Sequence, residues 1–307
     1  MTGMDPLNDR LDIYSAQLGT VSEIAPSTLA KYLLKAGNNI SLTPNPDGTW
    51  TIGSPIILGN VTFWVRTDGS DSNDGSANDP QHALATLPEA IARAANAFGS
   101  AIVTIRLGIP GMYPGNATIN HNLATLSIIG DAANQSQYVI GPVGVISSNV
   151  SITGVTATNV PGGNTVTAMG GAQVFLTNVT VQGNACKDSL ILSIGTGSGI
   201  QINAGCILAP TGNNPCAFES SGGAINLMSD LTVTGNPTFT NAFCNVFGAG
   251  GSCGRSGDKM PVINGTAQGQ RYYVQNLGFI QTIGGGPNYF PGTIAGTVVS
   301  STYGVYG

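Results

Sequence analysis

A short hydrophobic pattern returns at a nearly constant interval through the middle of the chain, and this repeat limits the possible folds more than any other feature. Each copy alternates apolar with small polar residues, which is the two-residue period of a strand with one buried face. The central aliphatic residues of the copies stand 24, 24, 26 and 25 positions apart: Ile128, Ile152, Leu176, Ile202 and Leu227. Gly, Asn, Pro and Ser, which turn a backbone, lie between the copies.

A repeat of this length that contains only short strands is typical of one coil of a parallel β-solenoid. Roughly 24 residues supply three short strands and three turns, and each coil buries its apolar face only by stacking on the next. We expect about six coils in residues 123–283, the later ones less regular. The alternative is a β-sandwich with evenly spaced hairpins. The Asn-Gly and Asp-Gly dipeptides that favour such hairpins do not occur in residues 123–236, so the solenoid is preferred.

The composition restricts the function classes. Charged residues make up only 8% of the 307 residues, hydrophobic residues 41%, and the 44 glycines have no collagen period, so the chain is neither disordered nor collagen-like. Its surface must consist of neutral polar side chains, which suit packing against copies of itself and hydrogen bonding to uncharged sugars. The net charge of −5 and the few basic residues argue against nucleic acid as a partner.

Targeting signals and cysteine patterns are absent from the sequence. Residues 1–10 have no apolar core, so no signal peptide is expected, and no stretch approaches the 18 apolar residues of a membrane span. The five cysteines, an odd number without CxxC spacing, argue against a disulfide framework and a zinc site. We expect free thiols that fill the solenoid interior: Cys186, Cys206, Cys216, Cys244 and Cys253.

The segments before the repeat have different patterns. Residues 1–36 are rich in helix formers, and an a/d seam over two heptads predicts a short helical or coiled-coil attachment segment: Leu7, Leu11, Tyr14, Leu18 and Val21. An ordinary amphipathic helix docked on another surface is the alternative. Residues 37–60 predict a β-hairpin junction that turns at Pro46-Asp47-Gly48. A lone hairpin is barely stable, so several chains side by side are expected.

Residues 61–122 predict the leader and cap of the solenoid. Val61–Val65 reads as a strand, and Thr86 and Glu89 have capping-box spacing with Pro88 in the first helical turn. The following apolar stripe predicts a helix that covers the open solenoid end: Leu87, Ala90, Ile91, Ala94, Ala95 and Phe98. Residues 284–307, rich in Gly and aromatic residues, form a tail that cannot build its own core and must lie on the solenoid or against sister chains.

Three stretches resemble known families. Residues 33–52, LLKAGNNISLTPNPDGTWTI, resemble the junction phrase of many bacteriophage tail fibres. Residues 61–65 and 80–91 resemble the leader of right-handed parallel β-helices of the pectate-lyase-like superfamily, including phage tailspikes and polysaccharide lyases, although Gln81-His82-Ala83-Leu84 stands where a Phe is more usual. Residues 291–297 resemble phage fibre termini. The resemblance implies an all-β, right-handed parallel β-helix, homotrimeric, in a phage virion.

An acidic loop precedes the expected cap helix. Asp68, Asp71 and Asp74 could offer oxygen ligands to calcium, which binds several oxygens of a flexible loop. Their three-residue spacing differs from the alternate spacing of an EF-hand loop. The alternative is a turn in which Asp, Ser and Asn side chains bind local backbone amides. No other cofactor is expected.

Few residues suit catalysis. A glycosidase needs two carboxyl groups about 5 to 9.5 Å apart, and equivalent positions on adjacent coils lie about 4.8 Å apart. No two acids of residues 123–283 are separated by the repeat length: Asp131, Asp188, Glu219, Asp230 and Asp258. The clusters 186–188 and 255–259 are the only candidates for a lyase base near an acid, and both are expected to be solvated turns. Pairing of carboxylates across chains stays open.

Three functions remain open. The preferred one is a phage tail fibre protein, made in the host cytoplasm without a signal peptide, that binds a host surface glycan or outer-membrane receptor and joins other tail or baseplate proteins through residues 1–36. The alternatives are a tailspike depolymerase that cleaves host polysaccharide and an architectural head-fibre or baseplate component. Aromatic side chains near the C-terminus are the candidate receptor contacts, unless they pack the trimer end: Tyr272, Tyr273, Tyr289, Tyr303 and Tyr306.

Overall fold

The computed structural model describes residues 41–44, 50–53, 59–96, 101–120, 125–254 and 261–307. The chain divides into two compact units, Met1–Ile56 and Ile57–Gly307. In the first unit, β1 (Ser41–Pro44) and β2 (Trp50–Gly53) pair antiparallel, within the segment where the sequence predicts a hairpin. The helical segment expected over residues 1–36 lies outside the described residues.

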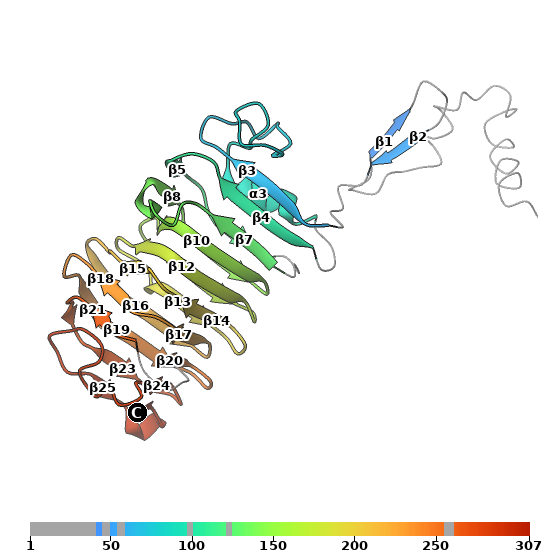
Figure 1. Ribbon diagram of the computed structural model, residues 1–307. Helices are drawn as coiled ribbons and strands as arrows, with labels where there is room; N and C mark the ends of the chain where they lie inside the picture. Colours follow the sequence, from blue (N-terminus) through green and yellow to red (C-terminus); the bar gives the residue numbers. More distant parts are fainter. Residues whose placement is uncertain (1–40, 45–49, 54–58, 97–100, 121–124, 255–260) are drawn as a thin grey trace, which may run out of the picture. The chain divides into compact units, whose positions relative to one another are not determined.

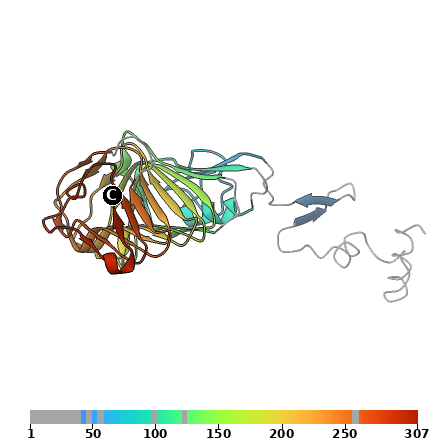
Figure 2. The ribbon, with the colours of Figure 1, turned by 90° about the horizontal axis from the view of Figure 1, so that it is seen from below.

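The second unit is a parallel β-solenoid of about eight turns (Figure 1). All pairings between its named strands are parallel, which excludes the β-sandwich alternative. The same stack is seen after a 90° turn in Figure 2. The sequence interval of about two dozen residues is therefore one winding of the chain around the solenoid.

Each winding contributes strands to three faces. The first face contains β3 (Val61–Val65), β4 (Ile102–Leu107), β7 (Thr125–Ile129), β10 (Asn149–Thr158), β12 (Gln173–Gln182), β14 (Gly199–Ile202), β17 (Ala224–Leu227), β20 (Ser252–Gly254), β24 (Phe279–Gln281) and β26 (Val305–Tyr306). The second face contains β5 (Gly111–Tyr113), β8 (Tyr138–Ile140), the C-terminal halves of β10 and β12, β15 (Ile207–Leu208), β18 (Leu231–Val233) and β21 (Ile263–Asn264). The third face contains β6 (Ala117–Ile119), β9 (Val143–Ile146), β11 (Val166–Met169), β13 (Ser189–Ile194), β16 (Asn213–Ser221), β19 (Thr238–Phe247), β22 (Gln268–Gly269), β23 (Tyr272–Val274) and β25 (Thr297–Val298).

The repeated aliphatic residues form one inward column, as the sequence predicts. Ile152 pairs with Ile128 on one side and with Leu176 on the other, and the column continues through Ile202 and Leu227. All five side chains are fully buried. Each of these side chains is covered by the residues of the windings above and below it, so the core is continuous along the solenoid.

The change of direction between the first and second faces occurs inside β10 and β12. Gly154 and Asn178 occupy equivalent places in these strands, and both have positive φ angles, 69° and 50°. A Cβ atom at position 154 would also lie 2.5 Å from the backbone nitrogen of Ala132. Glycine is therefore required there both by the backbone angle and by the close approach of the neighbouring winding.

The N-terminal end of the solenoid is covered by α3 (Leu87–Ala94). The Thr86 hydroxyl accepts a hydrogen bond from the backbone amide of Glu89, while the Glu89 carboxylate turns to Arg93 at 2.8 Å, so only half of the capping box forms. The helix packs on β3, β4 and β6 through buried residues: Leu87, Ala90, Ile91 and Ala94. Ala95, which the sequence places in the stripe, is exposed because the helix ends before it, and Phe98 lies outside the described residues.

The C-terminal tail continues the solenoid. Its strands β25 and β26 pair with β23 and β24, so residues 284–307 add to the stack. Phe290 is fully buried, with its ring centroid 5.9 Å from that of Phe243. Tyr272 and Tyr306 stack at 4.0 Å. These aromatic side chains cover the C-terminal end of the core, as α3 covers the other end.

Substitution of Leu176 by alanine should lower the free energy of unfolding by about 2–5 kcal/mol, because it opens a cavity in the middle of the aliphatic column. Ser151→Ala, on the outward side of β10, should change it by less than about 0.5 kcal/mol. Urea unfolding followed by circular dichroism measures both. Equal effects of the two substitutions would contradict a continuous core.

Candidate functional site

The outer side of the third face is concave near the C-terminal windings. The strands β16 and β19 are among the longest in the solenoid, and their pairing is shifted between Asn214 and Cys216. Ala217 and Phe218, although adjacent, both belong to the core cluster. The strand therefore bends at this point. The bend brings the side chains of Cys216 and Glu219, which flank it, toward each other.

An outward row of side chains crosses this concave strip, which we call the groove. In this row Leu192, Glu219, Asn245 and Tyr273 follow each other in register on β13, β16, β19 and β23. Cys216 lies beneath the surface beside this row, and its thiol makes a hydrogen bond with the Glu219 carboxyl group. Cys216 is fully buried but lies outside the core cluster. All five cysteines are free and buried, as the sequence predicts, and four of them belong to the core cluster.

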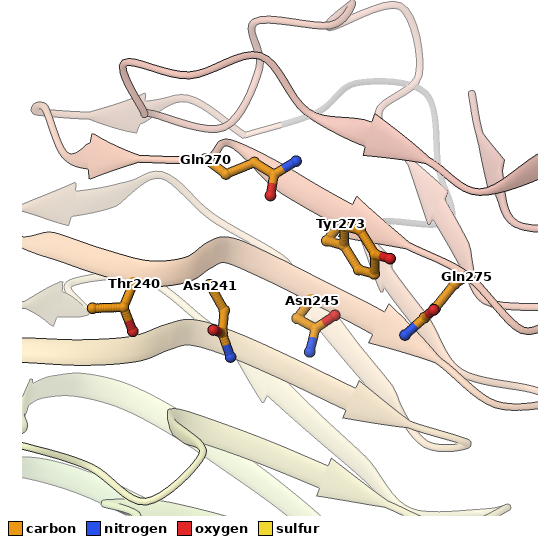
Figure 3. Close-up of a pocket in the computed structure, with 6 residues that line it drawn as sticks. All are labelled: Thr240, Asn241, Asn245, Gln270, Tyr273 and Gln275. Carbon is orange, nitrogen blue, oxygen red and sulfur yellow. The ribbon is translucent and has the colours of Figure 1, made fainter.

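The groove widens at its C-terminal end into a hollow of about 410 Å³ (Figure 3). Its lining consists of neutral side chains that offer both donors and acceptors around one aromatic ring: Thr240, Asn241, Asn245, Gln270, Tyr273 and Gln275. They come from β19, from β23 and from the residues that flank β23. The hollow can hydrogen-bond an uncharged polar molecule and stack on its flat apolar side.

Asn245 lies at the floor of this hollow with half of its amide unused. Its Nδ2 donates to a carboxylate oxygen of Glu219 at 3.2 Å. Its Oδ1 is buried, and no group among the described residues donates a hydrogen bond to it. A buried acceptor without a donor costs about 1–3 kcal/mol.

Glu219 is held in an environment that favours its neutral form. Burial raises the pKa of this carboxyl group above its ordinary value, and the charge of Asp188 acts in the same direction, while the hydrogen bond from Asn245 acts against it. Asp188 is fixed by the Asn164 amide at 3.2 Å. A partly buried carboxyl group with a raised pKa is suited to proton transfer.

The repeat length does not relate Asp188 to Glu219. Ser189 pairs with Cys216, a step of 27 residues, and Glu219 stands further along the bent strand. A bend in a strand leaves no motif in the sequence, so the sequence does not predict that the charge of Asp188 acts on Glu219.

The other catalytic candidates give no site. Residues 255–260 lie outside the described residues. His82 is exposed and makes an ion pair with Asp79 at 2.8 Å.

The five tyrosines proposed as receptor contacts have different environments. Tyr272 is buried and stacks on Tyr306, whose hydroxyl donates to the Gly286 carbonyl oxygen at 2.6 Å. The Tyr289 hydroxyl donates to the Pro261 carbonyl oxygen at 2.7 Å. These three residues build the C-terminal end of the core. Tyr273 lines the hollow, and Tyr303 is 75% exposed on the last turn.

The three loop aspartates considered for calcium each bind other groups of the chain. Asp68 makes an ion pair with Arg66 at 2.8 Å, and Asp74 binds Ser76. Asp71 accepts hydrogen bonds from the backbone amides of residues 85 and 86 and from the Thr86 hydroxyl, so it joins the loop to the start of α3. Within the described residues, no three Asp, Glu, His or Cys side chains are grouped as metal ligands would be. Asp74 corresponds to the side-chain-stapled turn, whereas Asp71 binds groups that are distant in the sequence.

Comparisons with protein-family models, with curated proteins and with solved structures found no match for this chain. The fold and the groove by themselves define a parallel β-solenoid with an open polar site on its outer surface. No helix in the described part of the chain has the length and apolar character needed to cross a membrane.

Replacement of Glu219 by glutamine should stabilise the protein at neutral pH. A carboxyl group with a raised folded-state pKa stabilises the fold most below its unfolded pKa, and this contribution is lost as the pH rises through the folded pKa. Glutamine keeps the acceptor for Asn245 but carries no charge. The gain in melting temperature should therefore be present at pH 7 and vanish as the pH falls below the ordinary value of 4.5.

Asp131 offers a control of opposite sign. Hydrogen bonds from Asn134 and from the backbone amide of Ala133 lower the pKa of its carboxyl group. Asp131→Asn should lower the melting temperature at pH 7, with a difference that shrinks as the pH falls below 3.8. Thermal unfolding at pH 3.5, 5 and 7 measures both variants. A lower melting temperature of Glu219→Gln than of the unaltered protein at pH 7 would show that the buried charge of Glu219 does not destabilise the fold.

Proposed function

We propose that this chain is a bacteriophage tail fibre protein that binds a glycan of the host cell surface in the groove of its third face. The observation that carries the proposal is the neutral hollow around Tyr273 on a stiff stack of windings. The tail-fibre-like junction of residues 33–52 and the β-helix leader of residues 61–91 supply the link to phage.

The chemistry of the hollow fits a sugar. Sugar rings present a flat face of C–H groups, which packs on an aromatic ring, and a rim of hydroxyl groups, which donate and accept hydrogen bonds. Tyr273 supplies the ring. The amides of Asn241, Gln270 and Gln275 supply donors and acceptors. The open shape admits a chain that extends beyond the hollow on either side.

A homotrimer would make a shallow site of this kind effective. Once one site of the trimer has bound, the other two identical sites bind the same surface as intramolecular events. The avidity of the trimer therefore exceeds the affinity of one site. The a/d seam of residues 1–36 is the segment expected to join the copies and to attach them to other tail or baseplate proteins. The protein then belongs to the virion.

A second candidate function, cleavage of the glycan, is favoured by Glu219 and Asp188. A carboxyl group with a raised pKa can protonate a glycosidic oxygen, and a second carboxylate can activate water or attack the sugar. Glu219 binds Asn245, which lines the hollow, and the charge of Asp188 acts on Glu219. In this case the protein would shorten the host polysaccharide, and Glu219→Gln would abolish the shortening while keeping the binding.

Substitution of Tyr273 by alanine should weaken binding of the purified protein to host surface polysaccharide about tenfold, which corresponds to ~1.4 kcal/mol. Tyr303→Ala removes an equally large and more exposed ring that does not line the hollow, and it should leave binding unchanged. Isothermal titration with the purified polysaccharide measures both. Binding that is lost in Tyr303→Ala and kept in Tyr273→Ala would place the contact at the C-terminal turn and refute the groove. Absence of binding by the unaltered protein to any host surface polysaccharide would refute the proposed function itself.

The molar mass in solution should be three times the chain mass of 31.1 kDa. Deletion of residues 1–36 should reduce it toward the mass of one chain, because the seam that joins the copies is removed. Light scattering coupled to size-exclusion chromatography measures both forms. A full-length protein with the mass of a single chain contradicts the trimer.

A further inference from the structure

A second hollow, of about 440 Å³, lies at the C-terminal end of the solenoid around Arg271. Its floor and rim come from the segments before β22 and from the loop that precedes β25. Apart from Arg271, the hydrogen-bonding side chains that line it are neutral: Asn236, Thr266, Gln268, Asn288 and Thr293. No acidic side chain lines it among the described residues. The hollow thus combines one positive charge with several uncharged hydrogen-bonding groups.

Arg271 occupies a position that is apolar in the preceding windings. Cys244 pairs with Tyr272, and the amide of Cys244 donates a hydrogen bond to the carbonyl oxygen of Arg271. The residues before this pair are therefore also in register, so that Arg271 follows Phe243 in the stack. The same position holds Leu190 and Ala217 in the windings before, and all three belong to the core cluster. At the last windings this column therefore ends in a charged side chain, which reaches the hollow.

The loop that covers Arg271 passes close to the arginine stem and to the backbone beneath it. A Cβ atom at position 292 would lie 2.8 Å from the carbonyl oxygen of Gly269 and 3.0 Å from the Cγ of Arg271, so the glycine found there permits this approach. The backbone amides of Thr293 and Ile294 donate to the carbonyl oxygen of Gly269 at 2.9 Å, and the Thr293 hydroxyl accepts from the Gly269 amide. These bonds fix the wall of the hollow against β22.

The other basic residues of the described chain have different surroundings. Arg66 and Arg93 form ion pairs with Asp68 and Glu89. Arg106 lies over the ring of Trp64, 5.7 Å from its centroid, and Lys187 is exposed in the loop before β13. Arg271 alone among the described cations is both half-buried and without a side-chain hydrogen bond or ion pair within the described residues.

We propose that this hollow is a binding site for an anionic group, either the carboxylate of an acidic sugar or a phosphate substituent. The planar guanidinium group of Arg271 binds two oxygens of such a group at once, and the neutral amides and hydroxyls around it bind the remaining oxygens. The site is separate from the hollow around Tyr273 and does not require that the groove binds a glycan. Where both sites act on one glycan, the end hollow selects chains that carry a negative charge.

Isothermal titration of the full chain with sodium glucuronate, with inorganic phosphate and with neutral glucose tests this site. We expect the unaltered protein to bind at least one of the two anions more tightly than glucose, and more weakly at higher salt concentration. Binding of glucuronate alone assigns the site to acidic sugars, and binding of phosphate alone assigns it to phosphate substituents. Binding of both supports a general anion site. Absence of binding of both anions overturns the proposal.

Arg271→Gln should weaken the anion binding about tenfold or more, because a hydrogen-bonded charge is lost. Arg106→Gln removes the same charge from the other end of the solenoid and serves as the matched control, with unchanged binding expected. If Arg271→Gln does not fold, Asn288→Ala, which removes an exposed amide from the rim, should still reduce affinity ~2-fold to 5-fold. Equal affinity of Arg271→Gln and the unaltered protein, or equal losses in Arg271→Gln and Arg106→Gln, contradicts the site. Tyr273→Ala should keep anion binding, so failure of the glycan groove and failure of this site can be distinguished.

Discussion

The dependence of every winding on its neighbours governs this structure. A single winding of about two dozen residues has three short strands and no partner for its backbone groups, and it cannot enclose an apolar side chain. Stacking solves both problems, because parallel pairing joins the backbone of one winding to the next and places Ile128, Ile152 and Leu176 in one buried column. The interior then allows only small deviations in side-chain volume, while the outward residues are free to vary in chemistry. The binding surface can thus change from winding to winding without loss of the fold.

The outward row that contains the candidate site shows this freedom. Along one register of the third face, the residue changes from Thr167 to Leu192, then to Glu219, Asn245 and Tyr273. The inward residues that precede them in three of these windings, Ile191, Phe218 and Cys244, belong to the core cluster. The chemistry of a polar groove therefore begins only where β16 bends. In a straight strand Cys216 and Glu219, three residues apart, would point to opposite faces of the sheet, whereas the bend places the thiol and the carboxyl group on the same side. The geometry of the backbone, more than the identity of any one residue, creates the site.

The sequence predicts the column but not the groove, and the reason is physical. Burial of an alternating face leaves a period that can be counted, so the register of Ile152 with Leu176 and the cap role of Leu87 and Ile91 follow from the pattern. The bend and the register shift at Asn214 and Cys216 arise where long strands pair with windings of unequal length. Such a pairing has no local signature. The tyrosines illustrate the same limit. Their composition suggested contact with a partner, but only the structure separates Tyr273 in the hollow from Tyr306 in the core.

The two ends of the stack meet the same requirement in different ways, and the difference bears on binding. At the N-terminal end α3 covers the core with four aliphatic side chains, and its one basic residue in the last turn, Arg93, is paired with Glu89. At the C-terminal end the cover is made by a loop with Tyr289 and Phe290, and the column beneath it terminates in Arg271, for which no carboxylate is supplied by the described residues around it. An arginine in a cap stabilises little by itself, because its charge must keep contact with water or an anion. Apolar residues hold the same position in three preceding windings, so an apolar side chain would satisfy the fold at least as well. We therefore attribute the charge at this position to the proposed anion site.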